Sequence, residues 1–127
     1  MEKVIVTSQG ESADSLIDSH FGRCKYLLVC DIEKKEVVKV IPNPNAEAES
    51  GAGVTTSQMV ADEGIKTVIT GNIGPKAFQV LEPTGIEIHI AKTGTVQEAL
   101  EALTDGSLEK VTSASAPAHE GLGQGKK

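Results

Sequence analysis

The run Val4-Ile5-Val6 contains no polar residue, and this sets the first constraint on the fold. A strand with one face in solvent alternates apolar and polar residues, whereas an uninterrupted apolar run is typical of a strand buried on both faces. The sequence therefore predicts that residues 3–7 form a central strand of a sheet. Very few aromatic residues and 13 glycines further predict a core of Val, Ile, Leu and Ala on closely packed backbone, which is an α/β composition.

Apolar runs separated by turn residues predict four more strands, and small or apolar residues at helical spacing predict three helices. Pro42 and Pro44 interrupt the sheet because proline has no amide donor for a strand ladder. Thr95 and Glu98 match a capping box at the start of the last helix. The last strand alternates isoleucines with polar residues and is expected at an edge of the sheet. The expected strands are residues 3–7, 25–31, 36–41, 67–70 and 86–90, and the expected helices begin at residues 53, 75 and 95.

The resulting order βββαβαβα fixes the direction of each strand. The first three strands form an antiparallel meander, and helical crossovers make the fourth and fifth strands parallel to the first. The predicted sheet order is 3-2-1-4-5, with only the second strand antiparallel. The glycine-rich segments then lie at the carboxyl ends of the parallel strands, where ligands bind in open α/β sheets. Three helix N-termini at that end would offer free amides and positive partial charge, which suit an anion.

The loop of residues 19–24, with the sequence SHFGRC, lies at this end and concentrates residue types that are rare elsewhere. Arg23 is the only arginine in 127 residues, and His20 and Cys24 are among three histidines and two cysteines. A titratable ligand, a soft ligand and a planar cation within five positions indicate a site. The alternative interpretation is that Phe21 plugs the end of the core while His20 and Arg23 only solvate a loop.

Residues in the other turns at the same end are further candidates for ligand contact. Gly51 and Gly53 lie at the start of a helix, and Asn72 and Gly74 lie in the turn before the next one. For each glycine the alternative is a role in a tight turn or in close helix packing, and Asn72 could simply stabilise its own turn. Their convergence on one end of the sheet favours ligand binding. Neither a Walker phosphate loop nor the dinucleotide fingerprint G-x-G-x-x-G is present in the sequence.

Charge and composition exclude several classes of function. A formal net charge of -6 opposes sequence-independent nucleic-acid binding, which needs a basic face. No apolar run approaches the roughly 20 residues of a membrane span or resembles a signal peptide, so we expect a cytoplasmic protein without membrane association. A nuclease needs several carboxylates around two divalent cations, and the first strand supplies none. We therefore expect that the protein is not an enzyme.

The two cysteines are expected to be reduced thiols. Cys24 and Cys30 lie on or beside one strand, and six residues at about 3.3 Å each place them about 20 Å apart, too far for a disulfide or one shared metal ion. Cys30 is therefore expected in the core. The chain is expected to form a single domain over residues 1–111, followed by a disordered tail rich in Ser, Ala and Gly over residues 112–127.

Several motifs agree in type, order and spacing with one known family. They are HFGR at residues 20–23, GAG at residues 51–53 and VITGNIGPKAF at residues 68–78, and over about residues 1–106 the chain resembles the dinitrogenase iron-molybdenum cofactor biosynthesis family. The resemblance implies a ribonuclease H-like three-layer fold with a five-stranded mixed sheet. It also implies relatives that bind or carry iron-molybdenum cofactor or its iron-sulfur precursor. One departure is Cys24, at a position where the family more often has a small residue such as alanine.

These observations favour a non-enzymatic carrier or accessory protein for an anionic metallocluster, of the iron-molybdenum cofactor or iron-sulfur precursor type. Helix N-termini, an arginine and soft or imidazole ligands suit such clusters because the clusters are anionic. The partners would be the cluster itself and cluster-assembly or acceptor proteins. The alternative is a small-anion sensor or protein-interaction module that keeps the fold and binds no cluster. The expected cofactor-binding residues are His20, Phe21, Gly22, Arg23, Gly51, Gly53, Asn72 and Gly74, and the expected metal ligands are His20 and Cys24.

Overall fold

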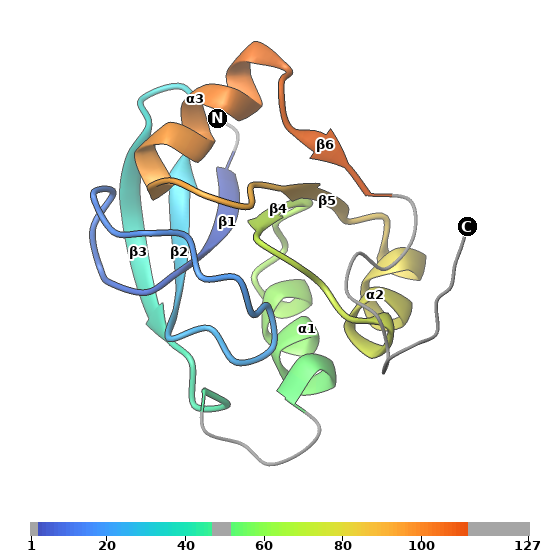
Figure 1. Ribbon diagram of the computed structural model, residues 1–127. Helices are drawn as coiled ribbons and strands as arrows, with labels where there is room; N and C mark the ends of the chain where they lie inside the picture. The colour runs from blue at the N-terminus through green and yellow to red at the C-terminus, as the bar shows by residue number, and fades with distance from the viewer. Residues whose placement is uncertain (1–2, 47–51, 112–127) are drawn as a thin grey trace.

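The computed structural model describes residues 3–46 and 52–111 of the 127-residue chain (Figure 1). The strands are β1 (Lys3–Ser8), β2 (Tyr26–Asp31), β3 (Glu36–Pro42), β4 (Thr67–Thr70), β5 (Glu87–Ile90) and β6 (Glu109–Lys110). The helices are α1 (Ala52–Asp62), α2 (Pro75–Leu81), the short 3-10 helix η1 (Glu82–Thr84) and α3 (Val96–Asp105). Each predicted strand and helix is present, so the predicted element order is confirmed, and β6 is an addition to it.

The six strands form one mixed sheet with the order β3-β2-β1-β4-β5-β6. β2 runs antiparallel to both β1 and β3, while β4 is parallel to β1 and β5 is parallel to β4. The predicted order 3-2-1-4-5 is therefore confirmed. It follows that β1, β4 and β5 all begin at one end of the sheet, the amino end, and all finish at the other, the carboxyl end.

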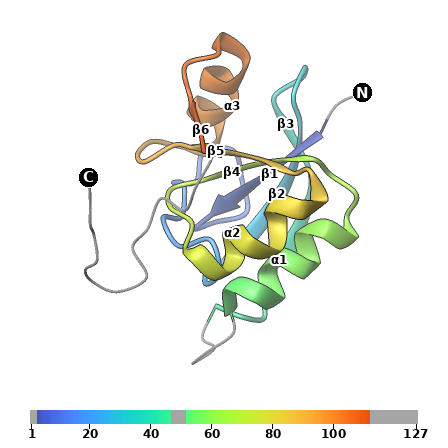
Figure 2. The ribbon, with the colours of Figure 1, turned by 90° about the vertical axis from the view of Figure 1, so that its right-hand side faces the viewer.

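Helices cover both faces of the sheet, which gives three layers (Figure 2). α1 and α2 lie together on one face and α3 lies on the other. The apolar run in β1 uses both layers, because Ile5 packs in a cluster with Val60 and Leu81, whereas Val4 and Val6 pack in the cluster that contains the buried residues of α3. Full burial of a Val or Ile side chain contributes roughly 1.5–3 kcal/mol. The architecture has the ribonuclease H-like topology that the resemblance implies.

Local sequence explains where the helices begin and end. Thr95 and Glu98 form the predicted capping box, in which the Glu98 amide donates to the Thr95 hydroxyl and the Thr95 amide donates to the Glu98 carboxylate. Gly106 ends α3 with a φ of 78°, a left-handed conformation that glycine adopts without steric cost. Pro75 occupies the first turn of α2, where its missing amide leaves no helical hydrogen bond unmade.

The prediction that the fifth strand lies at an edge of the sheet is wrong, because β6 pairs with its outer side. Ile90 lies opposite Glu109 in an antiparallel ladder. β6 consists of the two exposed, charged residues Glu109 and Lys110, so it lacks the apolar alternation by which a strand is recognised in a sequence. Its position is set by its neighbours, since Leu108 and Val111 pack against the two core clusters on opposite faces of the sheet.

Two predictions fall outside the residues that the structure describes. One concerns the tail over residues 112–127, and the other concerns Gly51 at the start of α1. Within residues 3–46 and 52–111, no helix has the length and apolar character needed to cross a membrane.

Candidate functional site

The connection from β1 to β2, called the β1–β2 loop below, lies at the carboxyl end of the sheet. The loop returns along itself, since the Gln9 amide donates to the Leu16 carbonyl (2.9 Å) and Ser8 forms an isolated antiparallel bridge with Ile17. Leu16 forms another such bridge with Thr95, just before α3. The predicted long loop is thus ordered by backbone contacts with β1 and with the start of α3.

Asp18 lies where this loop crosses the end of the sheet, and it is buried. One oxygen of its carboxylate accepts a hydrogen bond from the His20 amide (3.0 Å), and the other accepts one from the Lys25 amide (3.2 Å). Short-range hydrogen bonds from an Asp side chain to nearby amides are a common way to fix a turn. Asp18 therefore closes residues 20–25 into a ring, which is called the ring below.

Asn43 holds the same ring through its carbonyl groups. The side-chain amide of Asn43 donates to the carbonyls of Gly22 (3.0 Å) and Cys24 (2.8 Å). The Gly22 carbonyl also accepts a hydrogen bond from the Thr56 hydroxyl of α1 (2.8 Å). Because Asp18 binds amides of the ring and Asn43 binds its carbonyls, the backbone conformation of the ring is fixed by the protein itself.

Two glycines allow the ring and the residues before it to pack closely on neighbouring elements. A Cβ atom at Gly22 would lie 2.7 Å from the Gly53 nitrogen at the start of α1. A Cβ atom at Gly71 would lie 2.6 Å from the Ser19 Cα atom. Both distances are too short for a side chain, so the close approach requires glycine at each position. The loop thus fills space between α1 and the β4–α2 turn, where a ligand crevice was expected.

The expectation that three helix N-termini offer free amides is not met at α3. The Val96 amide donates to the Ser15 carbonyl (2.9 Å) and the Gln97 amide donates to the Ala13 carbonyl (2.9 Å), while the capping box takes the two flanking amides. The free amides at the start of this helix therefore bind carbonyls of the β1–β2 loop. The start of α3 therefore offers no free amides to an anion.

An open depression of about 620 Å³ lies beside the ring, on the side of β2 and β3. His20, Arg23 and Lys25 line it together with the Asp18 carboxylate. All three basic side chains are exposed, and that of His20 is 77% exposed. Among the described residues that line it, Arg23 and Lys25 against Asp18 give a formal charge of about +1 when His20 is neutral, on a protein whose net charge is -6. The depression is a locally cationic surface, and we call it the cationic depression.

Two residues predicted to contact a ligand lie in the core instead. Phe21 is buried in the cluster beneath α1 and α2, as in the alternative interpretation of a core plug. Cys24 is buried in the same cluster, and burial, with a smaller effect of the Asp18 charge, raises the pKa of its thiol to about 12. A covered thiol that stays protonated is a poor metal ligand. In the described part of the chain, no three His, Cys, Asp or Glu side chains are grouped to hold a metal ion.

The remaining predicted residues divide between packing and open surface. Gly53 lies where α1 and α2 pack, and a Cβ atom there would make an ordinary contact of 3.4 Å with the Ala77 Cβ atom. Asn72 is half-buried in the β4–α2 turn. Gly74 caps the start of α2 without a side-chain hydrogen bond, and a Cβ atom there would meet nothing within 4 Å. Of the two glycines, Gly74 has more room beside it.

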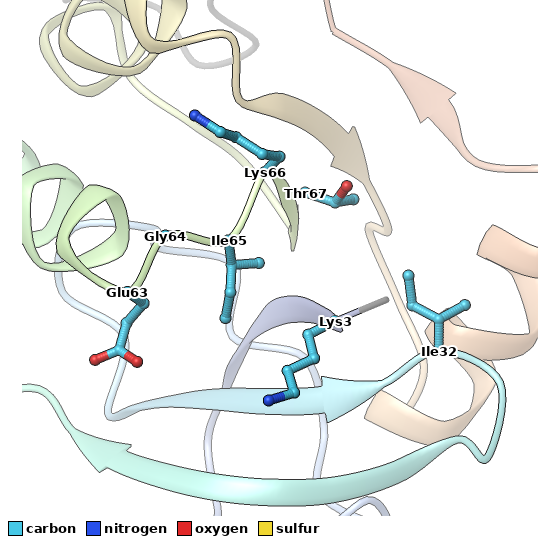
Figure 3. Close-up of a pocket in the computed structure, with 7 residues that line it drawn as sticks. All are labelled: Lys3, Ile32, Glu63, Gly64, Ile65, Lys66 and Thr67. Atoms are coloured by element: carbon cyan, nitrogen blue, oxygen red, sulfur yellow. The ribbon is translucent and has the colours of Figure 1, made fainter. Parts of the chain in front are cut away.

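A second depression, of about 410 Å³, lies at the amino end of the sheet (Figure 3). Its charged side chains are those of Lys3, Glu63 and Lys66. Glu63 is paired with Lys39 of β3 (3.1 Å), and the side chains of Lys3 and Lys66 point in different directions in Figure 3. A binding site needs polar groups that converge on one ligand. Of these two depressions, the cationic depression at the carboxyl end is the candidate functional site, because its charged side chains lie on one ring.

Sequence reasoning missed three residues of this site, namely Asp18, Lys25 and Asn43. Asp18 precedes His20 by two positions, which is the spacing at which an Asp side chain binds a backbone amide in a turn. The hydrogen bond from the His20 amide to Asp18 could therefore be predicted from the sequence. Asn43 stands between two prolines, and this local sequence indicates only a break in the sheet. The carbonyls that Asn43 binds lie 19 and 21 positions away, and no local pattern indicates them.

Comparison with known proteins identifies the family. The family model for dinitrogenase iron-molybdenum cofactor matches residues 2–106. The chain belongs to this family. The apo form of the orange protein from Desulfovibrio gigas has 30% sequence identity and a TM-score of 0.83, over 91% of this chain and 98% of that one. A NifB-like protein from Thermotoga, solved by NMR, has 31% identity and a TM-score of 0.77 over the same shares. An uncharacterised protein of Methanocaldococcus jannaschii is 33% identical over 96 residues, which are 74% of this chain and 81% of that protein.

Proposed function

We propose that this family member is a non-enzymatic carrier or accessory protein for an anionic metallocluster of the iron-molybdenum cofactor or iron-sulfur precursor type. The observation that carries the proposal is the structure of the ring. Its backbone is held by the buried residues Asp18 and Asn43. Its exposed side chains, His20, Arg23 and Lys25, border the cationic depression. The family supports the class of ligand, since its description names the iron-molybdenum cofactor.

Each exposed side chain of the ring has a distinct role in this proposal. Arg23 offers a permanent, planar charge with several donors, and Lys25 adds a compact second charge. Charge-assisted hydrogen bonds of this kind contribute about 1.5–3 kcal/mol each. His20 offers an imidazole nitrogen, a ligand that suits iron. Together these groups can neutralise an anion and add one bond to a metal atom.

The available donors fit a cluster that arrives already assembled. Iron-sulfur clusters are typically held by four cysteine thiolates, whereas this chain has two cysteines in total, and both Cys24 and Cys30 are buried. The cationic depression is open at the surface, so a preformed ion can enter without unfolding of the protein. The proposed role is therefore transfer, with a cluster-assembly protein as donor and an acceptor protein as recipient.

Anaerobic loading tests the proposal in two arms. The protein is incubated with isolated iron-molybdenum cofactor in one arm and with ferrous iron and sulfide in the other, and is then desalted. Absorption spectra and metal analysis should show bound iron and molybdenum in the first arm and no cluster in the second. Lys3→Ala, which alters the depression at the amino end, is the control variant and should load like the wild type.

A colourless, metal-free protein in both arms would contradict the proposal. The same fold would then serve as a small-anion sensor or as a protein-interaction module, the alternative that the sequence leaves open. A cluster that forms from iron and sulfide, and survives desalting, would contradict the transfer role and indicate assembly on the protein.

A further inference from the structure

We infer that Asp18 is a positioning residue of the cationic depression: it fixes the ring and orients His20 so that Nε2, rather than Nδ1, faces a bound metal atom. The inference rests on the proposed function for the identity of the ligand. It gives a role to a buried carboxylate whose negative charge would otherwise only oppose the binding of an anion.

The backbone of Asp18 is tied to two strands of the sheet. Its amide donates to the Thr7 carbonyl of β1 (3.0 Å), and its carbonyl accepts hydrogen bonds from the Thr7 hydroxyl (2.8 Å) and from the Gly71 amide after β4 (3.4 Å). The Thr7 hydroxyl also lies 2.9 Å from the Thr70 hydroxyl, and both threonines are fully buried. A residue supported in this way holds its side chain in a fixed position relative to the sheet.

The carboxylate of Asp18 connects this support to both ends of the ring. One oxygen accepts from the His20 amide and the other from the Lys25 amide, two and seven positions along the chain. Hydrogen bonds to an ionised acceptor are stronger than those between neutral groups. A single side chain therefore sets where His20, Arg23 and Lys25 leave the backbone and how far apart their charges stand.

The same carboxylate faces the imidazole ring of His20. Nδ1 of His20 lies 3.5 Å from the Asp18 carboxylate and 3.4 Å from the Ser19 hydroxyl. We assign the proton to Nδ1, the nitrogen that faces the carboxylate, and this tautomer leaves the Nε2 lone pair for a metal. Metal-binding histidines commonly donate their other N–H group to a carboxylate, which fixes the tautomer and the ring orientation. The His20 side chain is 77% exposed, so Nε2 can be reached from solvent.

Replacing Asp18 with Asn separates positioning from charge, because the two effects have opposite signs. If the Asp18 charge only repels the ligand, its removal strengthens the binding of an anionic cluster. If Asp18 positions the ring, Asp18→Asn weakens binding. The new NH2 group is a donor, so it cannot accept the hydrogen bond that a carboxylate oxygen accepts from the amide of His20 or of Lys25. The direction of the change in affinity therefore decides between the two.

The experiment compares Asp18→Asn with Asp14→Asn, which removes the same charge from an exposed position on the same loop. Isolated iron-molybdenum cofactor is titrated anaerobically into each protein, and melting curves are recorded alongside. We expect Asp18→Asn to bind about ten- to hundredfold more weakly than the wild type, and Asp14→Asn to bind as tightly as the wild type or slightly more tightly.

A second measurement needs no ligand. Nitrogen NMR of the His20 ring in the wild type, above the pH at which the imidazole is protonated, should show the proton on Nδ1, and Asp18→Asn should lose this preference. If Asp18→Asn does not fold, the wild-type spectrum alone decides.

Two results would overturn the inference. One is binding by Asp18→Asn that equals or exceeds that of the wild type, and the other is a wild-type His20 ring that carries its proton on Nε2. Failure of the proposed function looks different, because the wild type then binds no cofactor while the ring spectrum of His20 still reports on the Asp18 contact.

Discussion

Two buried aspartates, Asp18 and Asp31, organise turns at opposite ends of the sheet in different ways. One oxygen of Asp31, at the end of β2, accepts hydrogen bonds from the amides of Glu33 (2.9 Å) and Lys34 (3.1 Å), both within three positions. Asp18 instead uses both oxygens, and its second partner lies seven positions away. Asp31 therefore closes one tight turn, whereas Asp18 closes a loop large enough to place several side chains on one surface.

This difference distinguishes the candidate site from the other charged depression. At the carboxyl end, His20, Arg23 and Lys25 stand on one backbone ring that Asp18 and Asn43 hold by hydrogen bonds. Under the proposed function, the entropic cost of ordering this ring is therefore met during folding rather than during binding. At the amino end, Lys3 and Lys66 belong to separate elements and point apart (Figure 3). Similar charges thus converge at one end of the sheet and diverge at the other.

The largest expected effect is the loss of cluster binding when a charge is removed from the ring. Arg23→Ala should weaken the binding of isolated iron-molybdenum cofactor about ten- to hundredfold, because it removes a charge-assisted contact of about 1.5–3 kcal/mol. Arg23 is exposed, so the melting temperature should change little. Anaerobic titration followed by absorption measures the affinity.

The matched control is Lys66→Ala, which removes a positive charge from the depression at the amino end. This variant should bind the cofactor like the wild type. An equal loss of affinity in both variants would mean that net charge, and not convergence of charges on the ring, governs binding.

A smaller effect, on stability, should follow when a methyl group is added where the ring meets α1. Gly22→Ala places a Cβ atom 2.7 Å from the Gly53 nitrogen and 2.8 Å from its Cα atom. Backbone must move to relieve this clash, and overpacking of this kind costs about 1–3 kcal/mol. Urea unfolding should show the loss. Gly74→Ala is the control, since nothing lies within 4 Å of the added atom and φ is -82°, and its stability should be close to that of the wild type.

Most of the fold could be predicted because its signals are local. The run Val4-Ile5-Val6 showed that β1 is central, and the order of strands and helices then fixed the directions and the order of β1 to β5. β6 could not be predicted, because a two-residue strand of Glu109 and Lys110 is held by its neighbours rather than by its own pattern. Tertiary contacts decide such short pairings.

For the candidate site, the sequence indicated two side chains that border the cationic depression, His20 and Arg23, but not how the loop is built. Ligand contact by these residues stays a prediction. The unusual loop indicated His20 and Arg23 correctly as neighbours on one surface, since rare residue types can be counted in a sequence. The sequence left Phe21 open between ligand contact and a core plug, and it did not indicate the burial of Cys24. The direction of a side chain in an irregular loop depends on contacts made elsewhere. Asn43 is an example of such distant contacts, because the carbonyls of Gly22 and Cys24 come within reach of its side chain only when the sheet has folded.

The two buried thiols offer a pH test of the interior near each end of the sheet. Burial raises the pKa of Cys24 and of Cys30 to about 12, from 9.0. Each thiol therefore contributes stability that is present below about pH 9 and is lost as the pH rises toward 12. The loss should approach about 1 kcal/mol per cysteine at one pH unit above 9.

Urea unfolding at pH 8 and at about pH 10 measures this loss, and the double variant Cys24→Ala/Cys30→Ala separates it from other alkaline titrations. The stability of the wild type should fall more than that of the double variant between the two pH values. Identical falls in both proteins would show that the thiols ionise as readily in the folded state as in the unfolded state.

The smallest expected effect concerns Asp31, and it tests the contrast between the two aspartates directly. In Asp31→Asn the side-chain oxygen can still accept from the amides of Glu33 and Lys34, because a single oxygen serves both hydrogen bonds. Asn and Asp are almost equally good at satisfying free amides, so the free energy of unfolding should change by less than about 1 kcal/mol. Asp31→Ala removes the acceptor and should cost more. Urea unfolding of both variants beside Asp18→Asn measures the contrast. The free energy of unfolding could fall by the same amount in Asp31→Asn and in Asp18→Asn. That result would mean that the buried charge holds each turn, and that it does not matter whether one carboxylate oxygen or both accept hydrogen bonds.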